Sequence, residues 1–377
     1  MLEREKRKDM KYDYSNTMNS GENREKYLYE NIPLAVEAEE WDKNSPKEVL
    51  QYAVGALLYM PASNTKIAKK IISGEYSFIK AMVLDLEDSL GDDLVGFGQR
   101  AIQTTIRELG KAVEDGVITI SQIPLIFIRV REKKHIADAY KMLGKDMQYI
   151  TGFNIPKFDK KTCDGYIEAF KEVRDKVRAE SDTNLYMMPI IENKNTMYRQ
   201  LRMENLLYMN DKLRDIADNV LNIRVGGADF CQVYGIRRSM NDDIYDIGVV
   251  RSVLNDIVNV FGKSYIISGP VWEYFENADK PEDKRWSDGL KRELYADHLN
   301  GMLGKTSIHP SQLPIIHQSL IVDKLDYEDA MSILGMNTNT TGVKKSVGGN
   351  RMNEAKTHIN WARKTVGLAK MYGVKAE

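Results

Sequence analysis

The chain has 377 residues, and its 54 lysine and arginine residues almost balance its 55 aspartate and glutamate residues, which gives a formal net charge of −1. That balance excludes a global attraction to nucleic acid or to an anionic membrane, while 42% hydrophobic and 29% charged residues exclude extensive disorder. With two cysteines, a charged start and no apolar run near the ~20 residues of a membrane-spanning helix, the sequence predicts a cytoplasmic protein with no membrane or nucleic-acid partner.

The chain opens with a polar extension, residues 1–45, and Ser45-Pro46 then has the pattern of a helix start. From there, short apolar runs rich in β-branched residues alternate with longer segments of helical periodicity. The predicted strands are 55–60, 80–84, 125–130, 149–155, 185–191, 221–225, 264–267 and 306–308. The predicted helices are 64–73, 98–114, 133–143, 161–179, 195–217, 243–261, 284–303 and 311–320.

Eight strand–helix units in succession predict an α/β protein whose residues 46–322 form a (β/α)₈ TIM barrel. A doubly wound open sheet is the alternative, but no G-x-G-x-x-G follows the first predicted strand. A C-terminal helical segment, residues 323–377, comes next. It contains a short helix near 327–334, an Asn/Thr/Gly-rich linker over 337–350 and a final amphipathic helix near 352–372.

Charged side chains follow most of the predicted strands, at the end of a barrel that carries active sites. They are Asp85, Glu87, Asp88, Arg129, Lys157, Glu192 and Asp229. Carboxylates are the ligands that Mg²⁺ prefers, and we expect Glu192 and Asp229 to bind the ion directly. Asp85, Glu87 and Asp88 would hold metal-bound waters, and the planar fork of Arg129 would hold a substrate carboxylate. A metal ion and an arginine around one oxyanion site can stabilise an enolate.

Further residues at the same strand ends are predicted to contact the substrate, namely Pro61, Ser63, Asn64, Lys157, Gly227, Ala228 and His309. Several have structural alternatives. Asp88 could cap a helix, Arg129 could belong to a structural ion pair, and His309 could fix a loop. Lys157 could form a Schiff base in a metal-free aldolase, although the excess of carboxylates favours a lysine that stays charged.

The strand-end motifs resemble the citrate lyase β-subunit-like (HpcH/HpaI aldolase/citrate lyase) family of TIM-barrel C–C bond lyases. The resemblance spans roughly residues 55–335 and rests on the order of its motifs, each of which is weak alone. They are Leu58-Tyr59-Met60-Pro61, Val83-Leu84-Asp85-Leu86-Glu87-Asp88, Ile128-Arg129-Val130, Ile155-Pro156-Lys157, Pro189-Ile190-Ile191-Glu192, Gly226-Gly227-Ala228-Asp229-Phe230 and Ile308-His309-Pro310-Ser311-Gln312.

The resemblance implies Mg²⁺ on Glu192 and Asp229, a substrate carboxylate on Arg129, and C–C bond cleavage or formation through a metal-stabilised enolate. It implies a short 2-keto acid or an acyl-CoA thioester as substrate. It also implies a homo-oligomer, a trimer or hexamer, in which Glu354 is the catalytic acid, from its own or a neighbouring subunit.

Some segments depart from the family pattern. Ala62-Ser63-Asn64 stands where the family often has Gly/Ala-Asp-Arg, and residues 268–274 include the aromatic residues Trp272 and Tyr274 where the family commonly has a small acidic stretch. These departures resemble the divergent branch encoded in tellurite-resistance gene clusters. Two other functions remain open, an acyl-CoA thioesterase on the same barrel and a non-catalytic binding or assembly module in a stress-response system.

Overall fold

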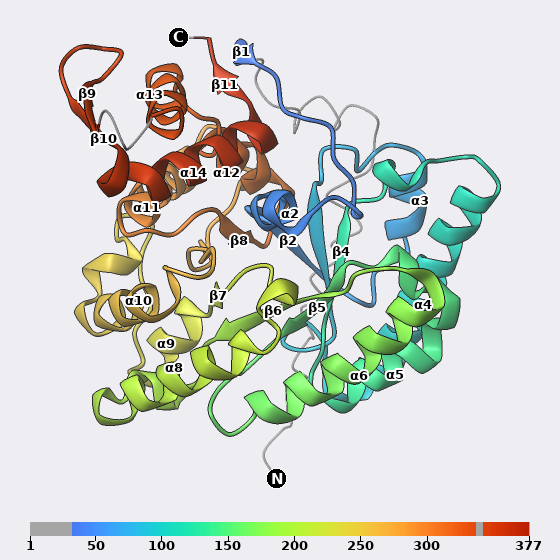
Figure 1. Cartoon of the computed structure of the whole chain (residues 1–377). Coiled ribbons are helices and arrows are strands. Elements are labelled where there is room, and N and C mark those ends of the chain that lie inside the picture. The colour runs from blue at the N-terminus through green and yellow to red at the C-terminus, as the bar shows by residue number, and fades with distance from the viewer. Residues whose placement is uncertain (1–31, 337–341, 377) are drawn as a thin grey trace.

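The computed structural model describes residues 32–336 and 342–376, and its centre is a parallel sheet (Figure 1). Hydrogen-bonded neighbours in this sheet follow the order β7-β6-β5-β4-β3-β2-β8. The strands are β2 (Ala56–Pro61), β3 (Ala81–Asp85), β4 (Leu125–Arg129), β5 (Gly152–Ile155), β6 (Tyr186–Ile191), β7 (Arg224–Val225) and β8 (Lys305–Ser307). All residues of β3 and β4 are buried, as expected for parallel strands covered on both faces.

The barrel closes through the segment predicted as the seventh strand. Residues 264–269 do not form a regular strand, but parallel bridges join Ile223 to Ile267 and Gly269 to Lys305, on the two edges of the sheet. Pro270 follows at once, and because proline has no N–H, pairing cannot continue through it. The TIM-barrel prediction is therefore confirmed, with its seventh strand reduced to single bridges.

Helices cover the outside of the sheet, and most match a predicted segment. They are α2 (Lys47–Ala53), α3 (Ile67–Ile72), α4 (Val95–Glu114), α5 (Lys134–Leu143), α6 (Cys163–Ser181), α7 (Lys194–Met197), α8 (Arg199–Arg214), α9 (Gly227–Val233), α10 (Gly248–Phe261), α11 (Arg285–Leu299), α12 (Leu313–Gln318), α13 (Lys324–Leu334) and α14 (Ala355–Tyr372). The predicted helix 195–217 is divided at Tyr198, whose backbone is extended. Helix α9 was not predicted. None of the described helices is long and apolar enough to cross a membrane.

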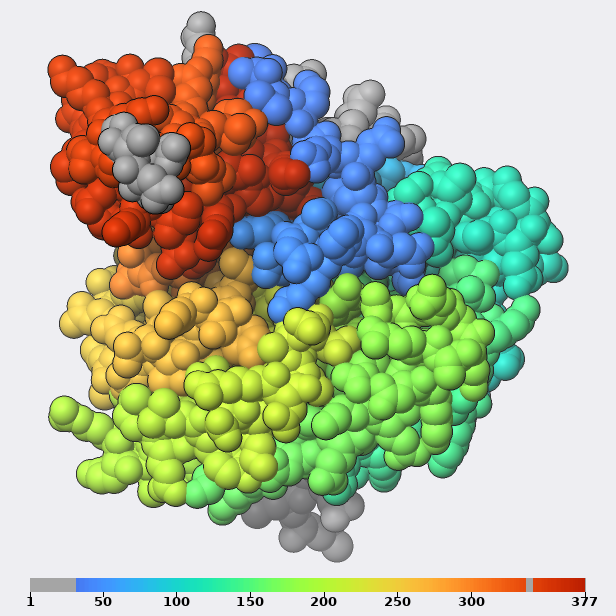
Figure 2. Space-filling view, in the orientation of Figure 1, coloured from blue at the N-terminus to red at the C-terminus, as the bar shows by residue number. Residues whose placement is uncertain are grey.

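The two ends of the described chain meet beside the barrel. Strand β1 (Leu34–Val36) pairs antiparallel with β11 (Val374–Lys375), and α14 packs on α2. The Tyr372 hydroxyl donates a hydrogen bond to the Tyr52 carbonyl at 2.7 Å. Figure 2 shows the C-terminal residues as one block next to the segment that precedes β2. Residues 1–31 of the predicted extension lie outside the described part, and the domain boundaries at 45 and 322 stay predictions.

The segment predicted as a linker, residues 337–350, contains a short strand, and its role as a linker stays a prediction. Residues 337–341 lie outside the described part, but Val343–Lys345 forms β9, which pairs antiparallel with β10 (Met352–Glu354). Asp329 of α13 is buried beneath this hairpin and accepts hydrogen bonds from Val347, Arg351 and Asn353. Because the acceptor of these hydrogen bonds, Asp329, comes from a helix outside the hairpin, local composition could not reveal the hairpin.

Candidate active site

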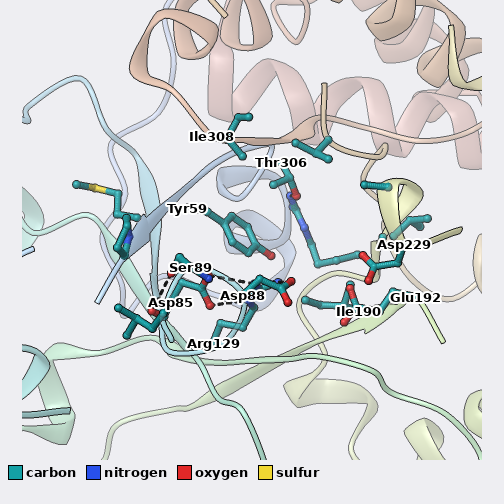
Figure 3. Close-up of a pocket in the computed structure, with 18 of the residues that line it drawn as sticks. Tyr59, Asp85, Asp88, Ser89, Arg129, Ile190, Glu192, Asp229, Thr306 and Ile308 are labelled. Atoms are coloured by element: carbon teal, nitrogen blue, oxygen red, sulfur yellow. Dashed lines mark hydrogen bonds and ion pairs between the residues drawn. The ribbon is translucent and has the colours of Figure 1, made fainter. Parts of the chain in front are cut away.

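A cavity of about 950 Å³ opens at the carboxyl ends of the barrel strands (Figure 3). Its walls combine charged side chains of the strand ends with apolar residues. The lining residues are Tyr59, Met60, Pro61, Ser63, Asp85, Asp88, Ser89, Leu90, Leu94, Arg129, Ile190, Glu192, Arg224, Val225, Gly226, Ala228, Asp229, Val271, Thr306 and Ile308. This set includes residues that are more than 240 positions apart in sequence, which the barrel brings to one mouth.

Arg129, at the end of β4, is held by three carboxylates. Its Nε and Nη2 atoms donate to Asp85 at 2.6 and 3.0 Å, and Nη2 also lies 2.9 Å from Asp88 and 3.1 Å from Glu87. The two-pronged edge that was expected to hold a substrate carboxylate is therefore occupied by Asp85, and the role of Arg129 in substrate binding stays a prediction. Among the described residues, Nη1 has no hydrogen-bond partner.

Asp85 also organises the loop that follows β3. Its two carboxylate oxygens accept the backbone N–H groups of Glu87 at 2.9 Å and Ser89 at 3.2 Å. Both oxygens of Asp85 are therefore engaged by Arg129 and the loop, and its role in holding metal-bound waters stays a prediction. Asp88 does not cap a helix; its carboxylate lies against Arg129 in the pocket.

Glu87 and Lys157 form an ion pair next to this cluster. Burial raises the pKa of Glu87, against the charge of Arg129. Burial would lower the pKa of Lys157, but the Glu87 carboxylate outweighs it and raises that pKa above its ordinary value. A Schiff-base lysine needs a lowered pKa, so these contacts do not favour the metal-free aldolase alternative. Asp88 has a lowered pKa, because Arg129 and the hydrogen bond from Glu87 outweigh the effect of its burial.

Glu192 and Asp229 come from successive strand ends and face each other across Gly226. A Cβ atom on Gly226 would lie 2.7 Å from Glu192 Oε2 and 3.1 Å from Asp229 Oδ2, so both oxygens flank one point. The other oxygen of Glu192 accepts the N–H of Lys157 at 2.7 Å. Lys157 has a φ of 48°, a left-handed conformation that is costly for a residue with a side chain. It directs the N–H group at Glu192.

These two carboxylates suit a hard divalent cation. Burial and the charge of Asp229 raise the pKa of Glu192 to about 8, because the buried acid has too little positive charge around it. Among the described residues, no group of three or more His, Cys, Asp or Glu could hold a metal ion. Mg²⁺ is commonly held by one or two carboxylates and completes its shell with water and substrate oxygens. The residues present therefore fit Mg²⁺ and do not fit a closed structural site.

The other predicted substrate contacts divide into two groups. Pro61, Ser63 and Ala228 line the pocket, whereas Asn64, Gly227, His309 and Lys157 are absent from its wall. Asn64 accepts the N–H of Lys66 and fixes a turn, and Gly227 packs closely on Pro270. His309 caps the turn at Pro310–Gln312 through Ser311 and stacks on Phe275, which is the loop-fixing alternative.

Glu354 does not line the pocket of its own chain. It ends β10 and precedes α14, where its N–H donates to the His358 ring at 2.9 Å. Strand β10 contacts β9, α13 and α14. The catalytic role of Glu354 stays a prediction.

The sequence matches the family described as C–C bond lyase of the TIM-barrel fold over residues 48–374. The chain belongs to this lyase family. The match covers the whole barrel and all of α14, so the C-terminal helix is part of the family's pattern. It also confirms the resemblance on which the strand-end motifs were interpreted. No curated protein sequence matches the chain.

Solved structures with a similar fold include a CitE protein and a malate synthase. The CitE protein of Mycobacterium tuberculosis, in complex with magnesium, acetoacetate and coenzyme A, has 14% identity and a TM-score of 0.50, with 85% of this chain and 99% of that chain covered. The malate synthase of Haloferax volcanii, in a magnesium/glyoxylate complex, has 17% identity and a TM-score of 0.52, with 70% and 74% covered. At these identities the likeness shows the fold alone.

Two pocket residues of this family member were missed by the sequence analysis. Tyr59 of β2 stands in the middle of the pocket, with the Arg129 guanidinium 5.4 Å from its ring centre and its hydroxyl accepting from Asn154 at 2.7 Å (Figure 3). Arg224 of β7 also lines the cavity. Arg224 stands between Ile223 and Val225 in a strand that is buried on both faces. A charged residue at such a position was the signal that could have identified Arg224.

Proposed function

We propose that this chain is a Mg²⁺-dependent C–C bond lyase or aldolase that acts on a short 2-keto acid or an acyl-CoA thioester through an enolate. The observation that carries the proposal is the pair Glu192 and Asp229, whose oxygens flank one point in the pocket. These two residues would hold the ion, which supplies positive charge for the oxygen of the developing enolate. The magnesium-bound relatives of the same fold support this choice of ion.

The other side chains would bind the substrate and move its protons. Arg129 is fixed in place by its carboxylates, so its free Nη1 group would donate to a substrate oxygen without reorganisation. Asp88 lines the pocket and stays ionised near neutral pH because its pKa is lowered. It would accept the hydroxyl proton of the substrate as the C–C bond breaks. Glu354 of a second copy would return a proton to the carbon.

The test measures enolate formation and binding together. Wild type is expected to exchange the methyl protons of pyruvate in D₂O, followed by NMR, only when Mg²⁺ is present. Glu192→Gln and Asp229→Asn should lose at least tenfold in both pyruvate affinity and exchange rate. Glu204→Gln is the matched control, since Glu204 is an exposed partner of Lys160 outside the pocket. Equal affinity in all four proteins would end the metal–enolate proposal.

Thioester hydrolysis is the alternative on the same residues, and mass spectrometry of products from an acyl-CoA separates it from carbon-bond cleavage. Release of free CoA with an intact acid would favour the thioesterase. A homo-oligomer, the cytoplasmic location and the link to tellurite resistance stay predictions from sequence and resemblance. Glu354→Gln tests whether the catalytic acid comes from a neighbouring subunit. If it does, mixing the Glu354→Gln protein with the Asp88→Asn protein should restore activity.

A further inference from the structure

Arg224 differs from the other buried arginines of the described chain in having no acidic partner. Arg129, Arg202 and Arg238 are each paired with a carboxylate within 4 Å. Arg224 is 1% exposed, and no ion pair to it is found among the described residues. Leaving a charge buried without a counter-charge is costly, so a protein retains one where something else supplies the negative charge.

The hydrogen bonds of Arg224 reach only neutral oxygens. Its Nη1 donates to the Val54 carbonyl at 3.3 Å and to the Ser268 hydroxyl at 2.9 Å, and its Nη2 donates to the Thr306 hydroxyl at 2.6 Å. Val54 precedes β2, so the guanidinium extends below the strand ends and forms the floor of the cavity. Burial lowers the pKa of Arg224, and the nearby Tyr59 phenol opposes that shift.

One edge of the guanidinium is incompletely used. The Nε atom is buried and has no hydrogen-bond partner, and Nη2 uses one of its two N–H groups on Thr306. A guanidinium presents Nε–H and one Nη2–H side by side, the arrangement that binds a carboxylate with two parallel hydrogen bonds. In Arg129 the same edge is filled by Asp85, whereas in Arg224 the Nε–H of this edge is buried and has no hydrogen-bond partner among the described residues.

We propose that Arg224 binds a second anionic group of the substrate, a carboxylate, at the floor of the pocket. The proposal rests on the proposed function, because Glu192 and Asp229 would hold the reacting end of the same molecule near the rim. Arg224 then selects dicarboxylic 2-oxo acids over monocarboxylic ones. Asn154, which donates to the Tyr59 hydroxyl, lies behind this wall of the pocket, and its Oδ1 atom is buried without a partner.

The experiment compares ligands that differ in their second group. Affinities for 2-oxobutyrate, 2-oxoglutarate, freshly prepared oxaloacetate and phosphonopyruvate are measured by calorimetry with Mg²⁺ present. Wild type is expected to bind one of the two dicarboxylates at least tenfold more tightly than 2-oxobutyrate. Arg224→Met should lose that preference and keep its affinity for 2-oxobutyrate within twofold. Arg224→Lys keeps the charge but lacks the fork, and should lose most of the preference too.

A second readout separates Arg224 from the metal site. In a Glu192→Gln background, where metal-dependent binding is removed, malonate and succinate should still raise the melting temperature, and adding Arg224→Met should abolish the shift. If Arg224→Met fails to fold, Arg224→Lys carries the same comparison. Equal preference in wild type and both Arg224 variants, or equal loss for mono- and dicarboxylates, overturns the proposal. Tightest binding of phosphonopyruvate overturns the assignment to a carboxylate.

Discussion

Replacing Gly226 by alanine tests the metal site through geometry, without removing any ligand. The added Cβ would lie 2.4 Å from Glu192 Cβ, whereas carbon atoms in contact are about 3.5–4.0 Å apart, so the side chain must move by roughly 1 Å. Mg²⁺ prefers near-ideal geometry at about 2.1 Å, so a displacement of this size would move the Glu192 carboxylate out of reach of an ion that it shared with Asp229. The backbone at Gly226 has φ −90°, so alanine adds no backbone strain.

We therefore expect Gly226→Ala to weaken Mg²⁺ binding by about 10- to 100-fold, which is ~1.4–2.7 kcal/mol. Overpacking should also lower the free energy of unfolding by ~1–3 kcal/mol. Calorimetric titration with Mg²⁺ measures the first effect and urea unfolding the second.

Gly110→Ala is the matched control. Its Cβ would lie 2.5 Å from the Tyr149 ring, so it produces a similar overlap in a helix outside the pocket. It should lose stability and keep Mg²⁺ affinity. Unchanged Mg²⁺ affinity in Gly226→Ala, or the same loss in both variants, would show that Glu192 and Asp229 do not share an ion.

Three further changes have expected effects on stability. Arg129→Met should cost ~3–5 kcal/mol in urea unfolding, because it leaves buried Asp85 without its counter-charge; a loss below 1 kcal/mol would contradict this. Tyr372→Phe should cost ~1 kcal/mol by removing the hydrogen bond to Tyr52, and an unchanged melting temperature would argue against it. Burial raises the pKa of Asp297 to about 6, so the folded state binds the carboxyl proton more tightly than the unfolded state does. The contribution of this proton to the free energy of unfolding is therefore full below pH ~4 and is lost as the pH rises through 6. Between pH 7 and 5, wild type should gain more stability than Asp297→Asn, and parallel slopes would refute the assignment.

Much of the fold followed from local patterns. Buried runs such as 81–84 and 125–128 are apolar throughout, and the helices between them repeat apolar residues every three or four positions, as Ile102, Ile106 and Leu109 do in α4. The order of these elements restricts the connections to right-handed crossovers and therefore predicts a barrel. The same patterns predicted a seventh strand around Ile267, but in the structure this segment is joined to the sheet only by single β-bridges.

The sequence also determined which charges would share the barrel mouth, because side chains at the ends of parallel strands meet at one edge. It could not determine what each charge would touch. The occupation of Arg129 by Asp85, the approach of Glu192 to Asp229 across Gly226 and the unpaired state of Arg224 depend on distances between strands far apart in the chain. Such contacts are set by how the barrel closes, which only the tertiary structure decides.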